Sequence, residues 1–236
     1  MGRKANKEQI ASKAAAMNWL DGLRIALEMG VNYTWAMEAA AENGHIQAME
    51  MIWNARRERK VELGGALSQA ARHGHINAIN WLIERSADEW VEHNLSEALS
   101  SAADGGQLTA MRTLRDHGAI PNLAIGHSAA VSGSIPVLEL AESWAGNLFA
   151  ASKGRMFYAA ANCGHAHVMR WLRSRYDIPQ EHLDGALCTA AANGELEAMC
   201  VAREYGATYL KSAYIKARDH KQKEAMALIL SWRPKK

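Results

Sequence analysis

One phrase recurs along this chain of 236 residues and constrains its fold more than any other feature. It consists of two alanines, two variable residues, a glycine and an apolar block. The six clear copies are Ala40-Ala41 with Gly44, Ala70-Ala71 with Gly74, Ala102-Ala103 with Gly106, Ala129-Ala130 with Gly133, Ala160-Ala161 with Gly164, and Ala190-Ala191 with Gly194. Degenerate copies at the two ends carry Asn18 and Lys221 at this glycine position, which recurs every 26 to 32 residues. A period of this length is typical of repeat proteins.

The block after each glycine position has the spacing of an amphipathic helix. A small or β-branched residue stands four positions on and a large apolar residue five positions on, as in Ala78-Ile79 and Ala110-Met111. Ala, Ile or Leu stands eight positions on. Because these offsets share one helical stripe, we predict a helix after each glycine position, with its large residue packed between neighbouring helices.

The glycine separates this helix from one that precedes it. A residue just past a helix end commonly adopts a positive φ, which glycine allows without steric cost and asparagine tolerates next best. Asn18 fits this rule, whereas Lys221 predicts a distorted final turn. The repeating unit is therefore a helix, a tight turn, a second helix and a connector.

We predict an all-α solenoid of about eight helix-turn-helix repeats, in which each pair of helices contacts mainly its neighbours. The repeats are expected at residues 8–30, 33–58, 63–88, 95–120, 123–148, 154–178, 183–208 and 210–232. Together they would form a single domain over residues 1–236.

The phrase resembles the second half of the ankyrin repeat, AAxxGHxEVVKLLLxxGA. His45, His75 and His165 stand at its histidine, and Gly118-Ala119 and Gly206-Ala207 stand at its closing Gly-Ala. The resemblance implies an ankyrin-like array that binds other proteins. The usual TPLH start of the first helix is missing and several repeats are short, so we expect the β-hairpins of that family to be reduced or absent. Short, divergent repeats of this kind are similar to ankyrin arrays of large DNA viruses and protists.

Composition places the chain among soluble globular proteins, with 49% apolar and 22% charged residues. No run of 18 apolar residues predicts a membrane span, and the first residues lack the apolar core of a secretory signal. The three cysteines form no CxxC pair, which fits a reducing compartment. We expect an intracellular, cytoplasmic protein without a membrane partner, in the host cytoplasm if the protein is viral.

Motifs for catalysis are absent from the sequence, which holds no HExxH, GxSxG, phosphate loop or GxGxxG. Cys163, His165 and His167 have the residue types of a metal site, but His165 stands at the ordinary histidine position of the repeat. We therefore expect no enzymatic activity, no cofactor and no metal, and assign the repeat histidines to turns and helix starts.

The predicted function is that of a non-enzymatic protein-protein interaction module, a scaffold or inhibitor. The residues expected to contact the partner are the variable ones between the alanine pair and the glycine position, on the concave face of the solenoid. They are Glu42, Asn43, Arg72, His73, Asp104, Ser132, Asn162, Asn193, Asp219 and His220. Their mixed charge favours another protein as the partner over DNA, and we expect a monomer.

Two alternatives remain open at this point. Residues 1–13 carry four cations and one anion, and residues 211–236 carry eight cations and two anions, giving +3 and +6. Basic ends of this kind favour a nucleic-acid-associated protein as one alternative, with nucleic acid as the partner. The other alternative is a structural subunit of a larger assembly, possibly of a virus.

Overall fold

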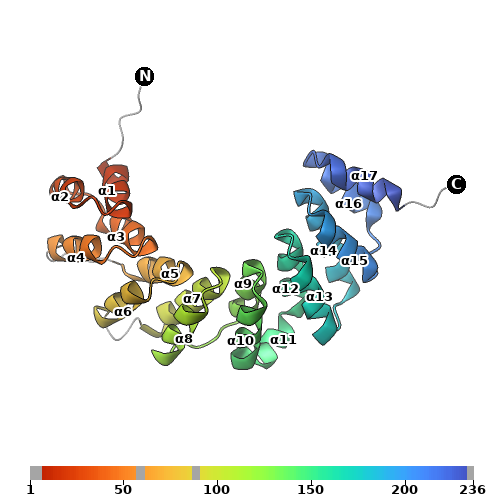
Figure 1. Ribbon diagram of the computed structural model, residues 1–236, viewed down its shortest axis with the longest axis horizontal. Helices are drawn as coiled ribbons and strands as arrows, with labels where there is room; N and C mark the ends of the chain where they lie inside the picture. Colours follow the sequence, from red (N-terminus) through yellow and green to blue (C-terminus); the bar gives the residue numbers. More distant parts are fainter. Residues whose placement is uncertain (1–6, 57–61, 87–90, 233–236) are drawn as a thin grey trace, which may run out of the picture. The chain divides into compact units, whose positions relative to one another are not determined.

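The computed structural model describes residues 7–56, 62–86 and 91–232, and these contain seventeen α-helices and no β-strand. Sixteen helices form eight pairs, each joined by a short turn at a glycine position (Figure 1). The predicted all-α class and its repeated helix pairs are therefore confirmed. The ends of the predicted repeats 33–58 and 63–88 lie outside the described residues.

In each pair, the first helix precedes the glycine position and the second helix follows it. The pairs are α1 (Lys7–Ala16) with α2 (Leu20–Glu28), α3 (Tyr33–Glu42) with α4 (Ile46–Ala55), α5 (Gly64–Arg72) with α6 (Ile76–Glu84), α7 (Val91–Asp104) with α8 (Leu108–Asp116), α9 (Ala124–Ser132) with α10 (Ile135–Ala145), α12 (Lys153–Asn162) with α13 (Ala166–Arg175), α14 (Gln180–Asn193) with α15 (Leu196–Glu204), and α16 (Leu210–Asp219) with α17 (Lys223–Ser231). The short helix α11 (Asn147–Ala151) was not predicted.

The chain divides into two compact units, residues 1–121 and 122–236. In the first unit, α1, α3, α5 and α7 contact one another in order along one side, and α2, α4, α6 and α8 do so along the other. In the second unit, α9, α12, α14 and α16 form the corresponding row of first helices. Each pair is thus covered mainly by its sequence neighbours, whereas the single domain expected from the sequence stays a prediction.

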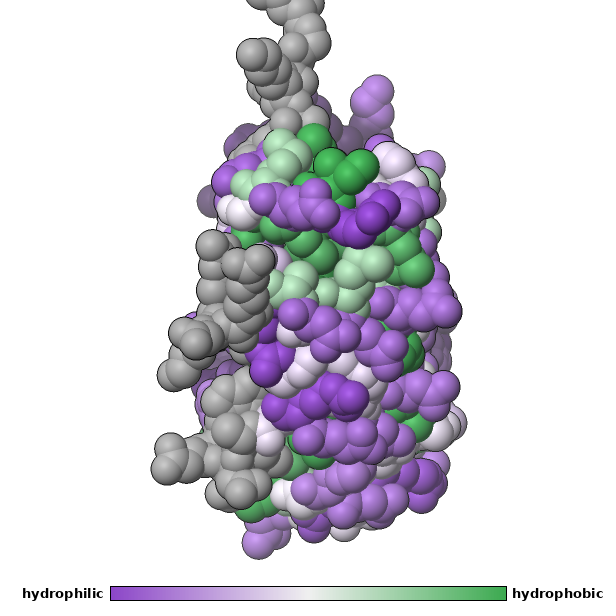
Figure 2. All heavy atoms as spheres, turned by 90° about the vertical axis from the view of Figure 1, so that its left-hand side faces the viewer, coloured by the Kyte–Doolittle hydropathy of each residue, from purple (hydrophilic) through white to green (hydrophobic). Residues whose placement is uncertain are grey.

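Burial confirms the predicted register of the second helices. The large apolar residue five positions past the glycine position is fully buried from Leu23 to Met199, with Met49 and Met111 among them. The side of the first unit that carries its second helices is largely hydrophilic outside this core (Figure 2). No described helix combines the length and the apolar composition that crossing a bilayer requires.

Two backbone hydrogen bonds close six of the eight described turns in the same way. His45 N donates to Ala40 O at 2.9 Å and Gly44 N donates to Ala41 O at 3.1 Å. This pair of bonds is the Schellman motif, and it requires a left-handed residue at the glycine position. The six glycines there have φ between 69° and 80°. At Gly133, however, Ser134 N donates to Ser132 Oγ, and at Gly194 the N–H groups of Gly194 and Glu195 both donate to Ala190 O. In the turns that make both bonds at an alanine pair, the carbonyl groups of that pair are therefore the acceptors that end the first helix.

The prediction that the final turn is distorted at Lys221 is wrong. Lys221 adopts φ 61°, its N–H donates to Arg218 O at 3.0 Å, and Gln222 N donates to Ala217 O at 2.8 Å. The last turn thus has the geometry of the others although its left-handed residue carries a β-carbon. The hydrogen bonds of the motif and the packing of α17 on α16 hold the lysine in this conformation.

We expect Lys221→Gly to raise the free energy of unfolding by up to about 1 kcal/mol. A left-handed conformation costs a residue with a β-carbon ~1–2 kcal/mol, and the extra freedom of glycine in the unfolded chain offsets part of that gain. Urea titration measures the change. Gly194→Lys is the matched control, because a β-carbon at Gly194 would lie 2.8 Å from Gln222 Oε1. The free energy of unfolding of this variant should fall by about 2 kcal/mol or more. A loss of stability in Lys221→Gly would contradict this account of the turn.

Candidate functional site

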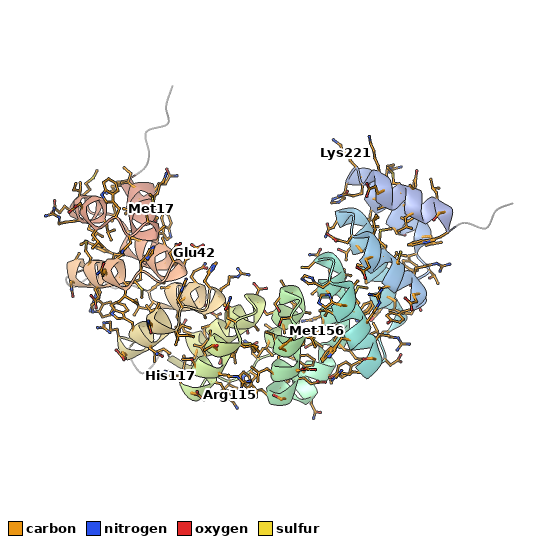
Figure 3. All side chains as sticks on the ribbon, viewed as in Figure 1. Met17, Glu42, Arg115, His117, Met156 and Lys221 are labelled. Atoms are coloured by element: carbon orange, nitrogen blue, oxygen red, sulfur yellow. The ribbon has the colours of Figure 1, made fainter. Side chains whose placement is uncertain are left out.

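The predicted contact residues lie where the first helices end. Glu42, Arg72, Asn162 and Asp219 are the last residues of α3, α5, α12 and α16. Glu42 is labelled at the end of α3 in Figure 3. The predicted set therefore follows the turn edge of each unit, one or two residues before the glycine position.

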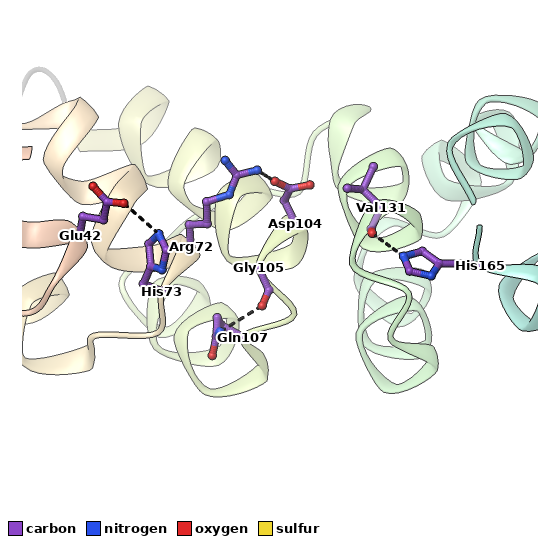
Figure 4. Close-up of polar contacts among 8 residues, drawn as sticks. All are labelled: Glu42, Arg72, His73, Asp104, Gly105, Gln107, Val131 and His165. Atoms are coloured by element: carbon purple, nitrogen blue, oxygen red, sulfur yellow. Dashed lines mark hydrogen bonds and ion pairs between the residues drawn. The ribbon is translucent and has the colours of Figure 1, made fainter. Parts of the chain in front are cut away.

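In the first unit, two pairs of these side chains bridge neighbouring repeats (Figure 4). Arg72 forms an ion pair with Asp104, whose side chain is 15% exposed against 50% for the arginine. His73 Nε2 lies 3.8 Å from Glu42 Oε1. Residues expected to be free for a partner thus also hold one repeat to the next.

In the second unit, Asn162 and Asn193 make the corresponding bridge. Asn193 Nδ2 donates to Asn162 O at 2.8 Å and to Asn162 Oδ1 at 3.0 Å. Thr189 Oγ1 donates to the same Oδ1 at 3.3 Å. The three side chains form a polar network between α12 and α14.

The remaining predicted residues act within their own repeats. Asn43 Nδ2 donates to Ala39 O at 2.9 Å, and Ser132 Oγ donates to Ala129 O at 2.7 Å. Asp219 accepts two hydrogen bonds from its neighbour Arg218, and His220 lies exposed on the last turn. The structure therefore joins Glu42, Arg72, His73, Asp104, Asn162 and Asn193 across repeats. Asn43, Ser132 and Asp219 make local contacts, and His220 is exposed.

The repeat histidines are structural, as expected. His45, His75 and His165 each place Nε2 within 3.1 Å of a carbonyl oxygen at the end of the preceding first helix, those of Ala16, Glu42 and Val131. Their rings lie over the preceding turn, because a β-carbon at Gly44 would be 2.8 Å from His75 Nδ1. Glycine is therefore required at that position both for its positive φ and for the close approach of the next repeat.

Sequence reasoning missed two exposed aromatic residues on the first helices. Trp35 on α3 is 53% exposed and Tyr158 on α12 is 44% exposed. Trp35, Glu38 and Glu42 stand at intervals of three and four residues, as do Arg155, Tyr158 and Asn162, so each trio shares one helical face. Helical spacing counted backward from Glu42 and Asn162 was the signal that could have found both.

Glu38 lies between Trp35 and Glu42 on this face. Burial raises the pKa of the Glu38 carboxyl, and the nearby Glu62 carboxylate raises it further. Its carboxylate packs over Gly65 of α5, where a β-carbon would collide with Oε1. The face is therefore closely packed across repeats at Glu38, whereas the side chain of Trp35 is exposed.

Asp184 anchors the last helix pair. This buried carboxylate, 3% exposed, accepts hydrogen bonds from Thr208 N, Tyr209 N, Thr208 Oγ1 and Gln180 Nε2. Burial raises the pKa of Asp184, but the hydrogen bonds from Thr208, Gln180 and Tyr209 outweigh it and hold the pKa below its usual value. The carboxylate thus fixes the connector that leads into α16.

A half-buried contact links α10 to the end of α13. The hydroxyl of Tyr176 donates to Glu142 Oε1. Burial and this hydrogen bond raise the pKa of Tyr176 to about 12. The tyrosine therefore stays a neutral donor throughout the neutral pH range.

Within the described residues, no three His, Cys, Asp or Glu side chains are grouped to hold a metal ion. His165 and His167 each place Nε2 against a backbone carbonyl, of Val131 at 2.9 Å and of Gly133 at 2.7 Å. The two histidines of the Cys-x-His-x-His sequence therefore make contacts with the preceding repeat.

A comparison with models of known protein families and with curated protein sequences finds no match for this chain.

We expect Asp184→Asn to lower the free energy of unfolding by about 1.5–3 kcal/mol at neutral pH, the range for hydrogen bonds to a charged group. Since the folded pKa is depressed, the carboxylate stabilises the protein above its unfolded pKa of about 3.9, and this contribution is lost as the pH falls through the folded value. The difference between the two proteins should therefore shrink in acid. Urea titrations at neutral pH and in acid measure it.

Asp177→Asn is the control for this comparison. The Asp177 side chain is 89% exposed beside Arg173, so its removal should change stability by less than ~0.5 kcal/mol at either pH. An Asp184→Asn protein as stable as the wild type at neutral pH would contradict the anchoring role.

Proposed function

We propose that this protein is an ankyrin-like module that binds another protein through the exposed face of its first helices and the adjoining turn edge. The observation that carries the proposal is the exposure of Trp35 and Tyr158 on the same helical faces as Glu42 and Asn162. Tyrosine, tryptophan and arginine are the residue types that supply most binding energy at protein interfaces, and Arg155 stands beside Tyr158.

The polar bridges support the same proposal. The Arg72–Asp104 pair and the Asn162–Asn193 network hold side chains of neighbouring repeats in fixed positions. A surface that is already ordered loses less conformational entropy when a partner docks. The bridges would therefore make the turn edge a preformed polar rim beside the aromatic residues.

The ankyrin-like assignment is also a proposal. It is supported by paired helices, by left-handed turns and by the histidines that bond to the preceding repeat. The proposed setting is the cytoplasm, of the host if the protein is viral, which suits the three free thiols of Cys163, Cys188 and Cys200. No catalytic step is part of the proposed function.

The experiment starts from a partner captured from the natural cell or host and identified by mass spectrometry. We expect Trp35→Ala and Tyr158→Ala each to weaken its binding by about tenfold or more, because truncating an exposed aromatic anchor costs over ~1 kcal/mol. Calorimetric titration measures the affinity. Stability should change by less than ~0.5 kcal/mol, since both residues are exposed.

Leu148→Ala is the matched control, an apolar residue 44% exposed on α11 and away from the first-helix faces. Arg72→Ala with Asp104→Ala tests the turn edge, and both residues change together so that neither charge is left unpaired. If Leu148→Ala abolishes binding and the first-helix variants do not, the binding surface is the connector edge and the proposal fails.

One observation favours nucleic-acid association as a second candidate, namely the exposed Lys211, Lys216, Lys221 and Lys223 of the last pair. We expect such binding to weaken by about tenfold or more as salt is raised from low to physiological concentration, because phosphate contacts release counterions. Fluorescence anisotropy with labelled duplex and single-stranded DNA measures it. A variant in which all four lysines are changed to glutamine loses four positive charges. If it bound DNA as tightly as the wild type, this candidate would be contradicted.

A further inference from the structure

The first helices of the second unit carry a short apolar stripe. Its members stand six positions before the glycine position of three successive repeats: Tyr158 on α12, Cys188 on α14 and Ile215 on α16. Tyr158 and Ile215 are 44% and 38% exposed, and Cys188 is half-buried. The three helices contact one another in order (Figure 1), so equivalent positions on them lie in a row.

Contacts between the repeats make this stripe continuous. A β-carbon on Gly185 would lie 3.6 Å from Cδ2 of Tyr158, so the tyrosine ring reaches from α12 to α14. Burial raises the pKa of the Cys188 thiol, the Asp184 carboxylate raises it further, and the Lys216 ammonium lowers it. Lys216 of α16 therefore lies near Cys188 of α14, and one surface extends across all three helices.

Two exposed cations flank the stripe. Arg155 stands one helical turn before Tyr158 on the same face of α12, and Lys216 lies near Cys188. Within the part of the chain that the structure describes, neither cation forms an ion pair, and the Tyr158 hydroxyl makes no hydrogen bond. These polar groups are therefore available to a ligand.

The charge of this side of the second unit favours an anionic ligand. Histidines apart, its four first helices and their turns carry six basic and four acidic residues: Lys153, Arg155, Lys211, Lys216, Arg218 and Lys221, and Glu181, Asp184, Glu195 and Asp219. Asp184 is buried among its hydrogen-bond donors, and Asp219 is paired with Arg218. Five cations and two carboxylates therefore remain for interactions with a ligand.

The first helices of the first unit have the opposite charge. Histidines apart, they carry three basic and six acidic residues: Lys7, Lys13 and Arg72, and Glu8, Glu38, Glu42, Glu92, Glu97 and Asp104. Trp35 shares its helical face with Glu38 and Glu42, whereas Tyr158 shares its face with Arg155. An anionic ligand is therefore attracted to the first helices of the second unit and not to those of the first.

We propose that this face of the second unit binds an acidic segment of the partner protein, in which carboxylates flank apolar side chains. The face consists of Arg155, Tyr158, Cys188, Ile215 and Lys216. The carboxylates of the segment pair with Arg155 and Lys216, and its apolar side chains cover the stripe between them. A nucleic-acid backbone would meet the cations but leave Ile215 uncovered, so the stripe favours a protein segment. The inference rests on the proposed function and adds the chemistry of the partner.

The test selects ligands from a random library of short peptides on the full-length protein. The selected peptides should combine acidic residues with large apolar ones, and calorimetric titration measures their affinity. Arg155→Glu with Lys216→Glu should weaken their binding by about tenfold or more, because like charges then face each other. The same variant should bind more tightly than the wild type to peptides in which lysine replaces the acidic residues. Both residues are exposed, so circular dichroism and the thermal midpoint should match those of the wild type.

Arg112→Glu with Lys223→Glu is the matched control. It makes the same charge change at exposed cations of the second helices α8 and α17, and it should leave the affinity unchanged. Acidic peptides that bind both double variants equally well overturn the proposal. Selected peptides without acidic residues overturn it too, as does a library that yields no peptide.

Tyr158→Ala separates this inference from the proposed function. Neutral or basic peptides that lose affinity in Tyr158→Ala would leave the face as a protein-binding surface and refute its acidic ligand. Selected peptides that bind Tyr158→Ala and the wild type equally would count against the binding surface itself. Labelled single-stranded DNA that binds in place of any peptide, and is lost in Arg155→Glu with Lys216→Glu, would assign the face to nucleic acid and overturn the proposal.

Discussion

The left-handed turn at the glycine position is the constraint on which the rest of the structure depends. In most repeats it ends the first helix on the carbonyl groups of the alanine pair, and the second helix starts two residues later. It also lies under the next repeat, since the ring of His75 covers Gly44 and that of His165 covers Gly133. One residue type therefore satisfies a backbone requirement and a packing requirement together, which explains why the phrase recurs so regularly.

The sequence predicted this architecture because its signal is local and repeated. The positions of Met49 and Met111 follow directly from the helical period after each glycine, and both are fully buried. Helix α11 was missed because it depends on the unusual backbone of Gly146, φ 47° and ψ −114°, in an insertion without periodicity. The helices α7 and α14 begin four and three residues before the predicted repeats at 95 and 183, where connectors rather than apolar spacing set the boundary.

The sequence predicted where the residues of the candidate site lie, but not which contacts they make with one another. Sequence spacing puts Arg72 and Asp104 at the turn edge of successive repeats, yet their ion pair depends on how the two repeats stack in space. The same stacking brings Asn193 to Asn162. Trp35 was missed because it lies outside the recurring phrase, on the face of α3 that no repeat signal marks. Variable positions in a repeat thus also hold neighbouring repeats together.

The two degenerate turns show how the constraint changes in the first and last of the described helix pairs. Asn18 keeps the left-handed turn with a short side chain, and the next repeat still bonds beside it through His45 and Ala16 O. The amide oxygen of Asn18 is buried and has no hydrogen-bond partner within the described residues. No described repeat packs over Lys221, so the long side chain meets no neighbour there. The backbone at Lys221 still adopts the positive φ of the other turns.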